Sequence, residues 1–285
     1  MDYKKKKEKD VVTIDSKNNA FSVNFNELIK YKDLIYLLVS RDFKVFYKQT
    51  ILGPFWYILQ PLLNSSIFTI IFGKIASLPT DNIPPFIFYM CGTIMWSYFS
   101  SCTLSVSQVF LTNRDLFSKV YFPRLVSPIS TILINLLQFF IQFFILICFI
   151  LYFHLMGIQF NFDYKLLLLP LLLLQLGIIS IGFGCLFASM TYKYKDLSIL
   201  LSFGMQLWMF ITPVIYPLSM VNKKYILLYS LNPVSSVIEN FRYILFGNVN
   251  FNLLLTLSSI IFSFIILFFG LYTFNKVQKN FMDTI

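Results

Sequence analysis

Six long runs without a charged side chain dominate this sequence and limit what it can fold into. They lie at 55–73, 86–110, 128–152, 166–190, 197–216 and 251–274. Each is close to the length of ~20 residues at which a helix crosses the hydrocarbon core of a bilayer, whereas a membrane β-barrel would alternate apolar and polar residues in short segments. The chain is 57% hydrophobic and only 13% charged, which is too apolar for a soluble domain of this length. We therefore predict an all-α polytopic membrane protein with six transmembrane helices.

The basic residues indicate which loops face the cytoplasm. Of the 23 Lys and Arg residues, 18 lie in the N-terminal region, in the 111–127 loop, at Lys193 and Lys195, or in the C-terminal tail. Because cytoplasmic loops carry the excess of Lys and Arg, these segments are predicted to be cytoplasmic. Both termini then lie on the cytoplasmic side. The net charge of +10 follows from this topology, so we expect no nucleic-acid partner.

The segments before and after the spans differ in composition. Residues 1–23 contain the lysine run KKKKEK and are predicted to form a disordered basic tail near anionic lipid. Residues 24–54 place apolar side chains along one face of a helix, which indicates an amphipathic helix in the cytoplasmic membrane interface. A soluble helix packed on a partner is the alternative. Residues 275–285 are predicted to form a short cytoplasmic tail.

The stretch 217–250 has an unusual pattern on the predicted outer side. It contains two helix-like pieces that are too short to span a bilayer, separated by Asn232 and Pro233. Short apolar pieces of this kind are tolerated at membrane depth where protein or water covers the break. We predict a re-entrant hairpin here, with an ordinary external loop as the alternative.

The sequence lacks the motifs by which transporters and enzymes usually draw energy or perform chemistry. The phosphate-binding pattern G-x-x-x-x-G-K-[ST] is missing, and the six runs contain no Asp, Glu or His to relay protons. His154 is the only histidine, and the cysteines, all inside the spans, have no metal-ligand spacing. We therefore expect this chain to bind no cofactor or metal and to have no catalytic residues. Either a partner supplies the energy or transport is passive.

Four stretches resemble a known family. They read RDFKVFYKQTILGPFWYILQPLL (41–63), KVYFPRLVSP (119–128), DLSILLSFGMQLWMFITPVIYP (196–217) and KYILLYSLNPVSSVIENFRYILFG (224–247). In order and spacing, over about residues 30–275, the chain resembles the permease subunits of ABC exporters that move cell-surface polysaccharides such as O-antigen, capsule and teichoic acid.

The resemblance implies a type-2 ABC exporter architecture in the inner (cytoplasmic) membrane. The permease would pair with a second copy of itself and with two nucleotide-binding subunits, on which ATP and Mg would bind. The substrate would be a lipid-linked polysaccharide, with O-antigen first and teichoic acid or capsule as alternatives. A drug or lipid exporter of the same architecture competes with this interpretation, and so does a membrane enzyme acting on a lipid-linked glycan. Such an enzyme would need an acid or base near the membrane, and only Asp81, Asp163 and Glu239 lie on the predicted outer side.

The loop at 111–127 is where the resemblance implies contact with the ATPase through a coupling helix. Asn113 is suited to cap a short helix that starts at Arg114, and Pro123 is suited to end it. The predicted coupling residues are Asn113, Arg114, Asp115, Leu116, Lys119, Tyr121, Phe122, Pro123 and Arg124. A solvated basic loop is the alternative.

Two spans carry mixed aromatic and polar stripes at helical spacing. The predicted channel residues are Tyr57, Gln60, Asn64, Phe68 and Phe72 in the first span, and Trp208, Thr212 and Tyr216 in the fifth. The resemblance implies a channel between two subunits, built from these same spans. Helix packing is the alternative role for both stripes.

The outer hairpin corresponds by resemblance to gate helices. The predicted gate residues are Asn232, Pro233, Glu239 and Arg242. Glu239 and Arg242 are three positions apart, so they are able to pair on one helix face. They would then either order the gate or form a solvated ion pair.

Overall fold

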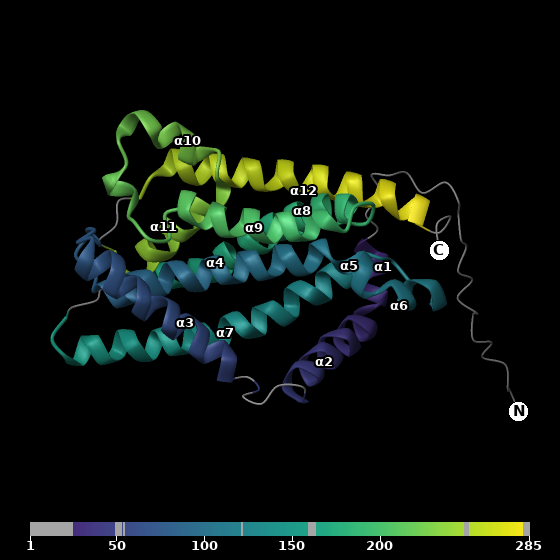
Figure 1. The fold of residues 1–285 in the computed structure, drawn as a ribbon, viewed down its shortest axis with the longest axis horizontal. Coiled ribbons are helices and arrows are strands. Elements are labelled where there is room, and N and C mark those ends of the chain that lie inside the picture. The colour runs from purple at the N-terminus through teal and green to yellow at the C-terminus, as the bar shows by residue number, and fades with distance from the viewer. Residues whose placement is uncertain are drawn as a thin grey trace, which may run out of the picture.

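The computed structural model is helical throughout most of the residues it describes, which are 25–48, 53, 55–120, 122–158, 164–247 and 251–281. This confirms the all-α class. The long helices lie side by side in one elongated bundle, as Figure 1 shows. The predicted basic tail at 1–23 and Tyr121 of the predicted coupling loop lie outside the described residues.

The described helices follow one another in the order in which the apolar runs appear. They are α1 (Phe25–Lys30), α2 (Lys32–Lys48), α3 (Phe55–Phe68) with a π-helical continuation at Thr69–Ile75, α4 (Pro85–Ser107), α5 (Val109–Thr112), α6 (Arg114–Lys119), α7 (Val126–Leu155), α8 (Leu169–Thr191) preceded by a 3-10 turn at Tyr164–Leu168, α9 (Asp196–Ile211), 3-10 turns at Leu218–Met220 and Lys223–Tyr225, α10 (Ile226–Ser230), α11 (Pro233–Phe246) and α12 (Leu253–Phe281).

Four of the described helices are long and apolar enough to cross a membrane. They are Phe55–Ile75, Val126–Leu155, Tyr164–Thr191 and Leu253–Gln278, and they correspond to the first, third, fourth and sixth predicted spans. The second predicted span coincides with α4, which has 23 residues but carries several Ser, Thr and Tyr side chains. The fifth coincides with α9, which has only 16 residues. The count of six spans therefore stays a prediction.

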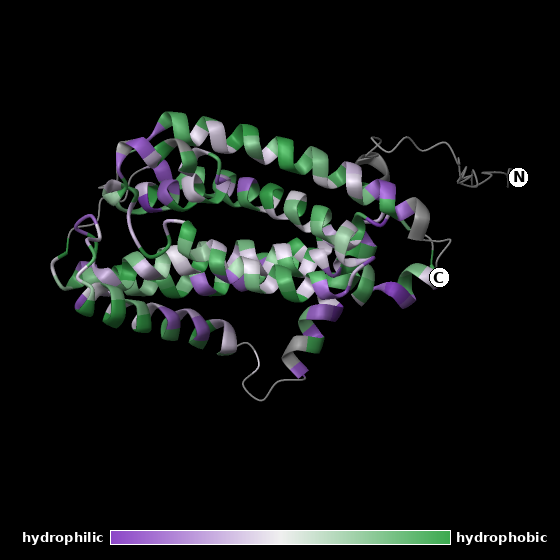
Figure 2. Ribbon diagram, turned by 45° about the horizontal axis from the view of Figure 1, so that its top comes forward, coloured by the Kyte–Doolittle hydropathy of each residue, from purple (hydrophilic) through white to green (hydrophobic). Residues whose placement is uncertain are grey.

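The position of α4 explains why it is able to be more polar than its neighbours. It packs against α3, α7, α8, α9 and α11, and an unbroken stretch of it, 87–96, is buried. The surrounding helices instead expose large apolar side chains such as Phe144, Leu174 and Ile261. Figure 2 shows the result, because apolar residues run along the long helices and hydrophilic ones gather at the two ends of the bundle. Exposed apolar surface of this extent on an uncovered helix is typical of contact with lipid or with another subunit.

Two glycines bring α8 and α12 into backbone contact. A Cβ atom placed on Gly270 would overlap the Gly182 carbonyl, and one placed on Gly182 would lie 2.7 Å from the side chain of Ile266. Small residues of this kind allow membrane helices to approach closely. The two helices thus form a tightly packed pair along one side of the bundle.

Within the stretch predicted as an outer hairpin, the chain breaks at Asn232 and Pro233, as the sequence predicts. Asn232 Oδ1 accepts a hydrogen bond from the Val234 amide at 3.2 Å, and Pro233 occupies the first turn of α11, which is the usual N-terminal pattern. Gly247 ends α11 in the left-handed region with φ of 69°, as glycines after a helix commonly do. The first piece is short, since α10 has only five residues. Nearly every residue of α11 is buried.

Candidate functional site

The predicted coupling loop forms two short helices at one end of the bundle. As predicted, α6 begins at Arg114, but the predicted Asn113 cap is wrong. Its Nδ2 donates to the Val109 carbonyl at 3.4 Å, and its Oδ1 accepts from Arg41 Nη2 at 3.5 Å. The reason is that α5 runs directly into Asn113, which places its side chain beside the preceding turn. The helix also ends at Lys119, before Pro123 is reached.

One face of this loop packs into the protein. Phe117 and Phe122 are buried with their ring centroids 5.4 Å apart. Arg124, which we expected to offer its charge to a partner, is only 5% exposed. Its guanidinium lies 5.4 Å from the Phe117 ring centroid, and Nη1 donates to the Gln278 carbonyl at 3.0 Å. Arg124 therefore joins the loop to the end of α12 and does not belong to the accessible face.

The opposite face of the loop is accessible. Arg114, Asp115, Lys119 and Val120 are exposed, and Leu116 is half-buried. We call these five residues the coupling face. Charged groups around an apolar patch are the composition expected of a surface that recognises a protein partner.

The amphipathic helix predicted at 24–54 is attached to this same end of the molecule. It is divided by a turn at Tyr31 and ends at Lys48. Leu28 and Leu38 are buried in a cluster with apolar residues of the coupling loop and of α12. Tyr36 is 75% exposed, and Phe43 is exposed as well. The helix thus has a protein-facing side and a second, exposed aromatic side.

The stripe predicted in the first span separates into two parts. Gln60 and Asn64 are exposed, whereas Tyr57, Phe68 and Phe72 are half-buried. The Phe68 ring lies 5.6 Å from that of Phe72 and 6.3 Å from that of Tyr89, measured between centroids. The Phe68 ring of α3 therefore packs against α4, whereas the side-chain amides of Gln60 and Asn64 remain accessible.

The stripe predicted in the fifth span faces the protein. Trp208 packs with its ring centroid 5.0 Å from that of Phe183 and 5.3 Å from that of Phe99. Thr212 is buried, and its Oγ1 accepts from Asn232 Nδ2 at 3.0 Å. Tyr216 pairs its hydroxyl with that of Tyr229 at 2.7 Å. These contacts attach α9 and the residues that follow it to α4, α8, α10 and Asn232.

The exposed face of α9 carries a polar residue that the stripe did not include. Gln206 is exposed beside Phe203, Leu207 and Phe210. Gln206 is the only Asn or Gln residue between 196 and 217. A lone side-chain amide in an apolar run is the sequence signal that could have identified it. Together with Gln60 and Asn64 it gives three accessible amides on helices that both flank α4.

The predicted gate pair is buried. Arg242 has 0% exposure and Glu239 7%, and Arg242 Nη1 donates to Glu239 Oε1 at 3.2 Å. The alternative of a solvated pair is therefore wrong.

Arg242 also holds three parts of the chain together. Its guanidinium donates to the carbonyls of Pro213 at 2.7 Å and Val214 at 2.8 Å, and it lies 3.7 Å from the Phe88 ring centroid. Gly92 makes room for it, because a Cβ there would lie 2.7 Å from Arg242 Nη2. The segment after α9 is thereby fixed to both α4 and α11.

Within the described residues, no three His, Cys, Asp or Glu side chains are grouped as a metal site would require. The predicted gate, channel and coupling residues all lie between Tyr57 and Arg242, inside the range 33–246 that matches a known protein family.

Residues 33–246 match the family described as ABC-2 type transporter. The O-antigen export system permease protein RfbA of Klebsiella pneumoniae is 27% identical over 252 residues, covering 88% of this chain and 94% of that protein. A protein of the same name from Myxococcus xanthus is 28% identical over 225 residues, covering 77% of this chain and 83% of its own length. The family match extends from α2 to the last residue of α11. The chain therefore belongs to the ABC-2 type transporter family, as its resemblance to ABC exporter permeases predicted.

Proposed function

We propose that this chain is the permease subunit of an ABC exporter that carries a lipid-linked polysaccharide of the O-antigen kind across the inner membrane. The observation that carries the proposal is the nearly full-length similarity to two proteins named O-antigen export system permease. In this proposal ATP and Mg bind to two copies of a separate nucleotide-binding subunit. The permease itself contributes the path and the surface on which force is transmitted.

The proposed topology has six spans, with α4 as the second and α9 as the fifth. The coupling loop, α1 and the end of α12 share one apolar cluster, so the proposal places them together on the cytoplasmic side. Tyr36 and Phe43 of α2 would then enter the lipid headgroup region. The hairpin of α10 and α11 would re-enter the outer half of the membrane, supported by the burial of α11 within the protein.

The proposed path lies between two copies of the chain. The α3 segment is the least buried of the four long apolar helices, and α9 exposes Phe203, Leu207 and Phe210. Faces this apolar require lipid or a second subunit. Gln60, Asn64 and Gln206 would supply hydrogen-bonding groups to sugar hydroxyls along an otherwise apolar wall.

We expect that a strain lacking this chain loses its surface O-antigen and accumulates the lipid-linked polymer on the cytoplasmic side. The measurement is an immunoblot of surface polymer beside extraction of the lipid-linked form, with re-expression of the chain as the control. Loss of teichoic acid or capsule in place of O-antigen would identify that polymer as the substrate. Unchanged surface polymers would contradict the proposal.

We expect the double variant Gln60→Leu and Asn64→Leu to export polymer several-fold more slowly than the wild type. Both side chains are exposed, so their replacement removes groups for sugar hydroxyls without opening a cavity in the core. The rate of appearance of surface polymer checks this, and the matched control is Leu63→Met, an exposed apolar position on the same helix. Equal rates in the double variant and the control would show that Gln60 and Asn64 are not part of the path.

A further inference from the structure

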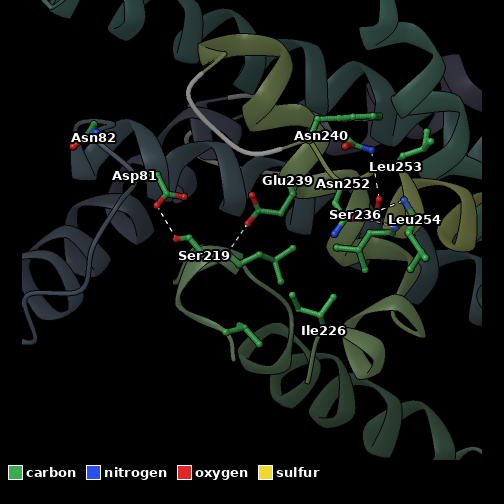
Figure 3. A pocket seen from close by; sticks show the side chains of 14 residues that line it. Asp81, Asn82, Ser219, Ile226, Ser236, Glu239, Asn240, Asn252, Leu253 and Leu254 are labelled. Atoms are coloured by element: carbon green, nitrogen blue, oxygen red, sulfur yellow. Dashed lines mark hydrogen bonds between the residues drawn. The ribbon is translucent and has the colours of Figure 1, made fainter. Parts of the chain in front are cut away.

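A cavity of about 560 Å³ lies at the end of the bundle opposite the coupling loop. It is formed by the loop before α4, the segment after α9, the start of α10, α11 and the start of α12, as Figure 3 shows. Its volume falls in the range of about 300–1,000 Å³ that is usual for small-molecule sites.

Two carboxylates line this cavity. Asp81 Oδ1 accepts a hydrogen bond from Ser219 Oγ at 2.7 Å. Glu239 Oε1 accepts from the Leu218 amide and from Arg242, both at 3.2 Å. The second carboxylate oxygen of Glu239 has no hydrogen-bond partner within the described part of the chain, although the residue is more than nine-tenths buried. This oxygen is not one of the enclosed side-chain atoms that lack a partner, so it stays accessible from the cavity that Glu239 lines. It is therefore open to a hydrogen-bond donor of a ligand or to water.

The amides of the cavity are held in place by their own hydrogen bonds. Asn240 Nδ2 donates to Thr256 Oγ1 at 3.1 Å. Asn252 Oδ1 accepts from the amides of Leu254 and Leu255 at the start of α12. The positions of these polar groups are therefore fixed before any ligand arrives, which lowers the entropic cost of binding.

The charge of the lining restricts what the cavity accepts. Its fourteen described lining residues include Asp81 and Glu239 but no Lys, Arg or His. Carboxylates accept hydrogen bonds strongly from hydroxyl groups and repel phosphate and other carboxylates. Phe251, which is 48% exposed, adds an aromatic face of the kind that covers the C–H side of a sugar ring.

We infer that this cavity binds uncharged, hydroxyl-rich sugar units of the exported polymer at the far end of its path. The inference rests on the proposed function for the origin of its ligand, and it narrows the substrate to glycans without phosphate or uronic acid groups. It also gives Glu239 a ligand-facing oxygen in addition to its structural bond to Arg242.

The test uses the full-length chain in lipid nanodiscs with two probes that differ only in a phosphate group, maltose and maltose 1-phosphate. Ligand-observed saturation-transfer NMR measures both affinities. We expect maltose to bind, and maltose 1-phosphate to bind several-fold more weakly, with a smaller difference in the Asp81→Asn variant. Ile226 lines the cavity, so Ile226→Trp should reduce maltose affinity by about tenfold or more.

The matched control is Leu231→Trp, because Leu231 is exposed beside the same short helix and does not line the cavity. It should bind maltose as the wild type does. The inference is overturned if maltose does not bind, if maltose 1-phosphate binds as tightly, or if Leu231→Trp and Ile226→Trp bind maltose equally. Binding to the nanodisc needs neither ATPase nor export, so failure here leaves the strain experiment untouched, and failure of export leaves the cavity measurement standing.

Discussion

Replacing Arg242 with methionine is expected to destabilise the folded permease by about 3–5 kcal/mol, the usual cost of removing one partner of a buried ion pair. The guanidinium is fully buried and donates to Glu239 and to the Pro213 and Val214 carbonyls. Without it, the Glu239 carboxylate stays buried with its partner gone, and two backbone acceptors lose their donor. The segment after α9 would keep its bonds through Leu218 and Thr212 but lose those to Arg242.

The measurement is the thermal unfolding midpoint in detergent, followed by fluorescence-detected size exclusion. Arg114→Met is the matched control, because it removes the same charge from an exposed position and should leave the midpoint unchanged. The double variant Arg242→Met and Glu239→Gln should recover part of the loss, since no carboxylate is then buried alone. A single variant as stable as the wild type would show that these contacts contribute little.

Reversing the charge of the coupling face, with Arg114→Glu and Lys119→Glu together, is expected to abolish stimulation of the partner ATPase and polymer export. Both residues are exposed on α6, so insertion and folding should be retained. Complementary charges at an interface fix its register, and like charges oppose docking. The same substitution at Arg124 would be uninformative, because that side chain is buried and bonded to Gln278.

ATP hydrolysis by the reconstituted complex and the amount of surface polymer are the two measurements. The matched control is Lys195→Glu, which reverses an exposed charge in another loop on the same predicted side of the membrane. It should support normal export. If the Arg114 and Lys119 double variant is also stimulated and exports normally, docking on the coupling face is ruled out.

Local signals in the sequence were sufficient for the long helices and for several of their ends. The apolar runs predicted the four long apolar helices because hydrophobic length is a property of contiguous residues. The start of α6 at Arg114 and the break at Asn232 and Pro233 also depend on neighbouring residues alone. The near-complete burial of α11 depends instead on the helices that surround it.

The direction in which side chains point could not be predicted in this way. Periodicity placed Trp208 and Thr212 on one face of a helix, but only the positions of α4, α8 and Asn232 decide that this face is inside. Arg124 was expected to offer its charge to a partner, and Arg242 was expected to pair with Glu239 three positions away. Their partners, Gln278 and the Phe88 carbonyl, are each 154 positions away in the sequence.

The glycine contact between α8 and α12 limits how this permease is able to work. Separating or sliding these two helices would leave a gap where Gly182 and Gly270 now touch, so the pair should behave as a stationary frame through every cycle. The width that the proposed path requires must then come from displacement of helices outside this pair, such as α3, the least buried of the long apolar helices. Motion during transport is thereby expected in the part of the chain outside α8 and α12.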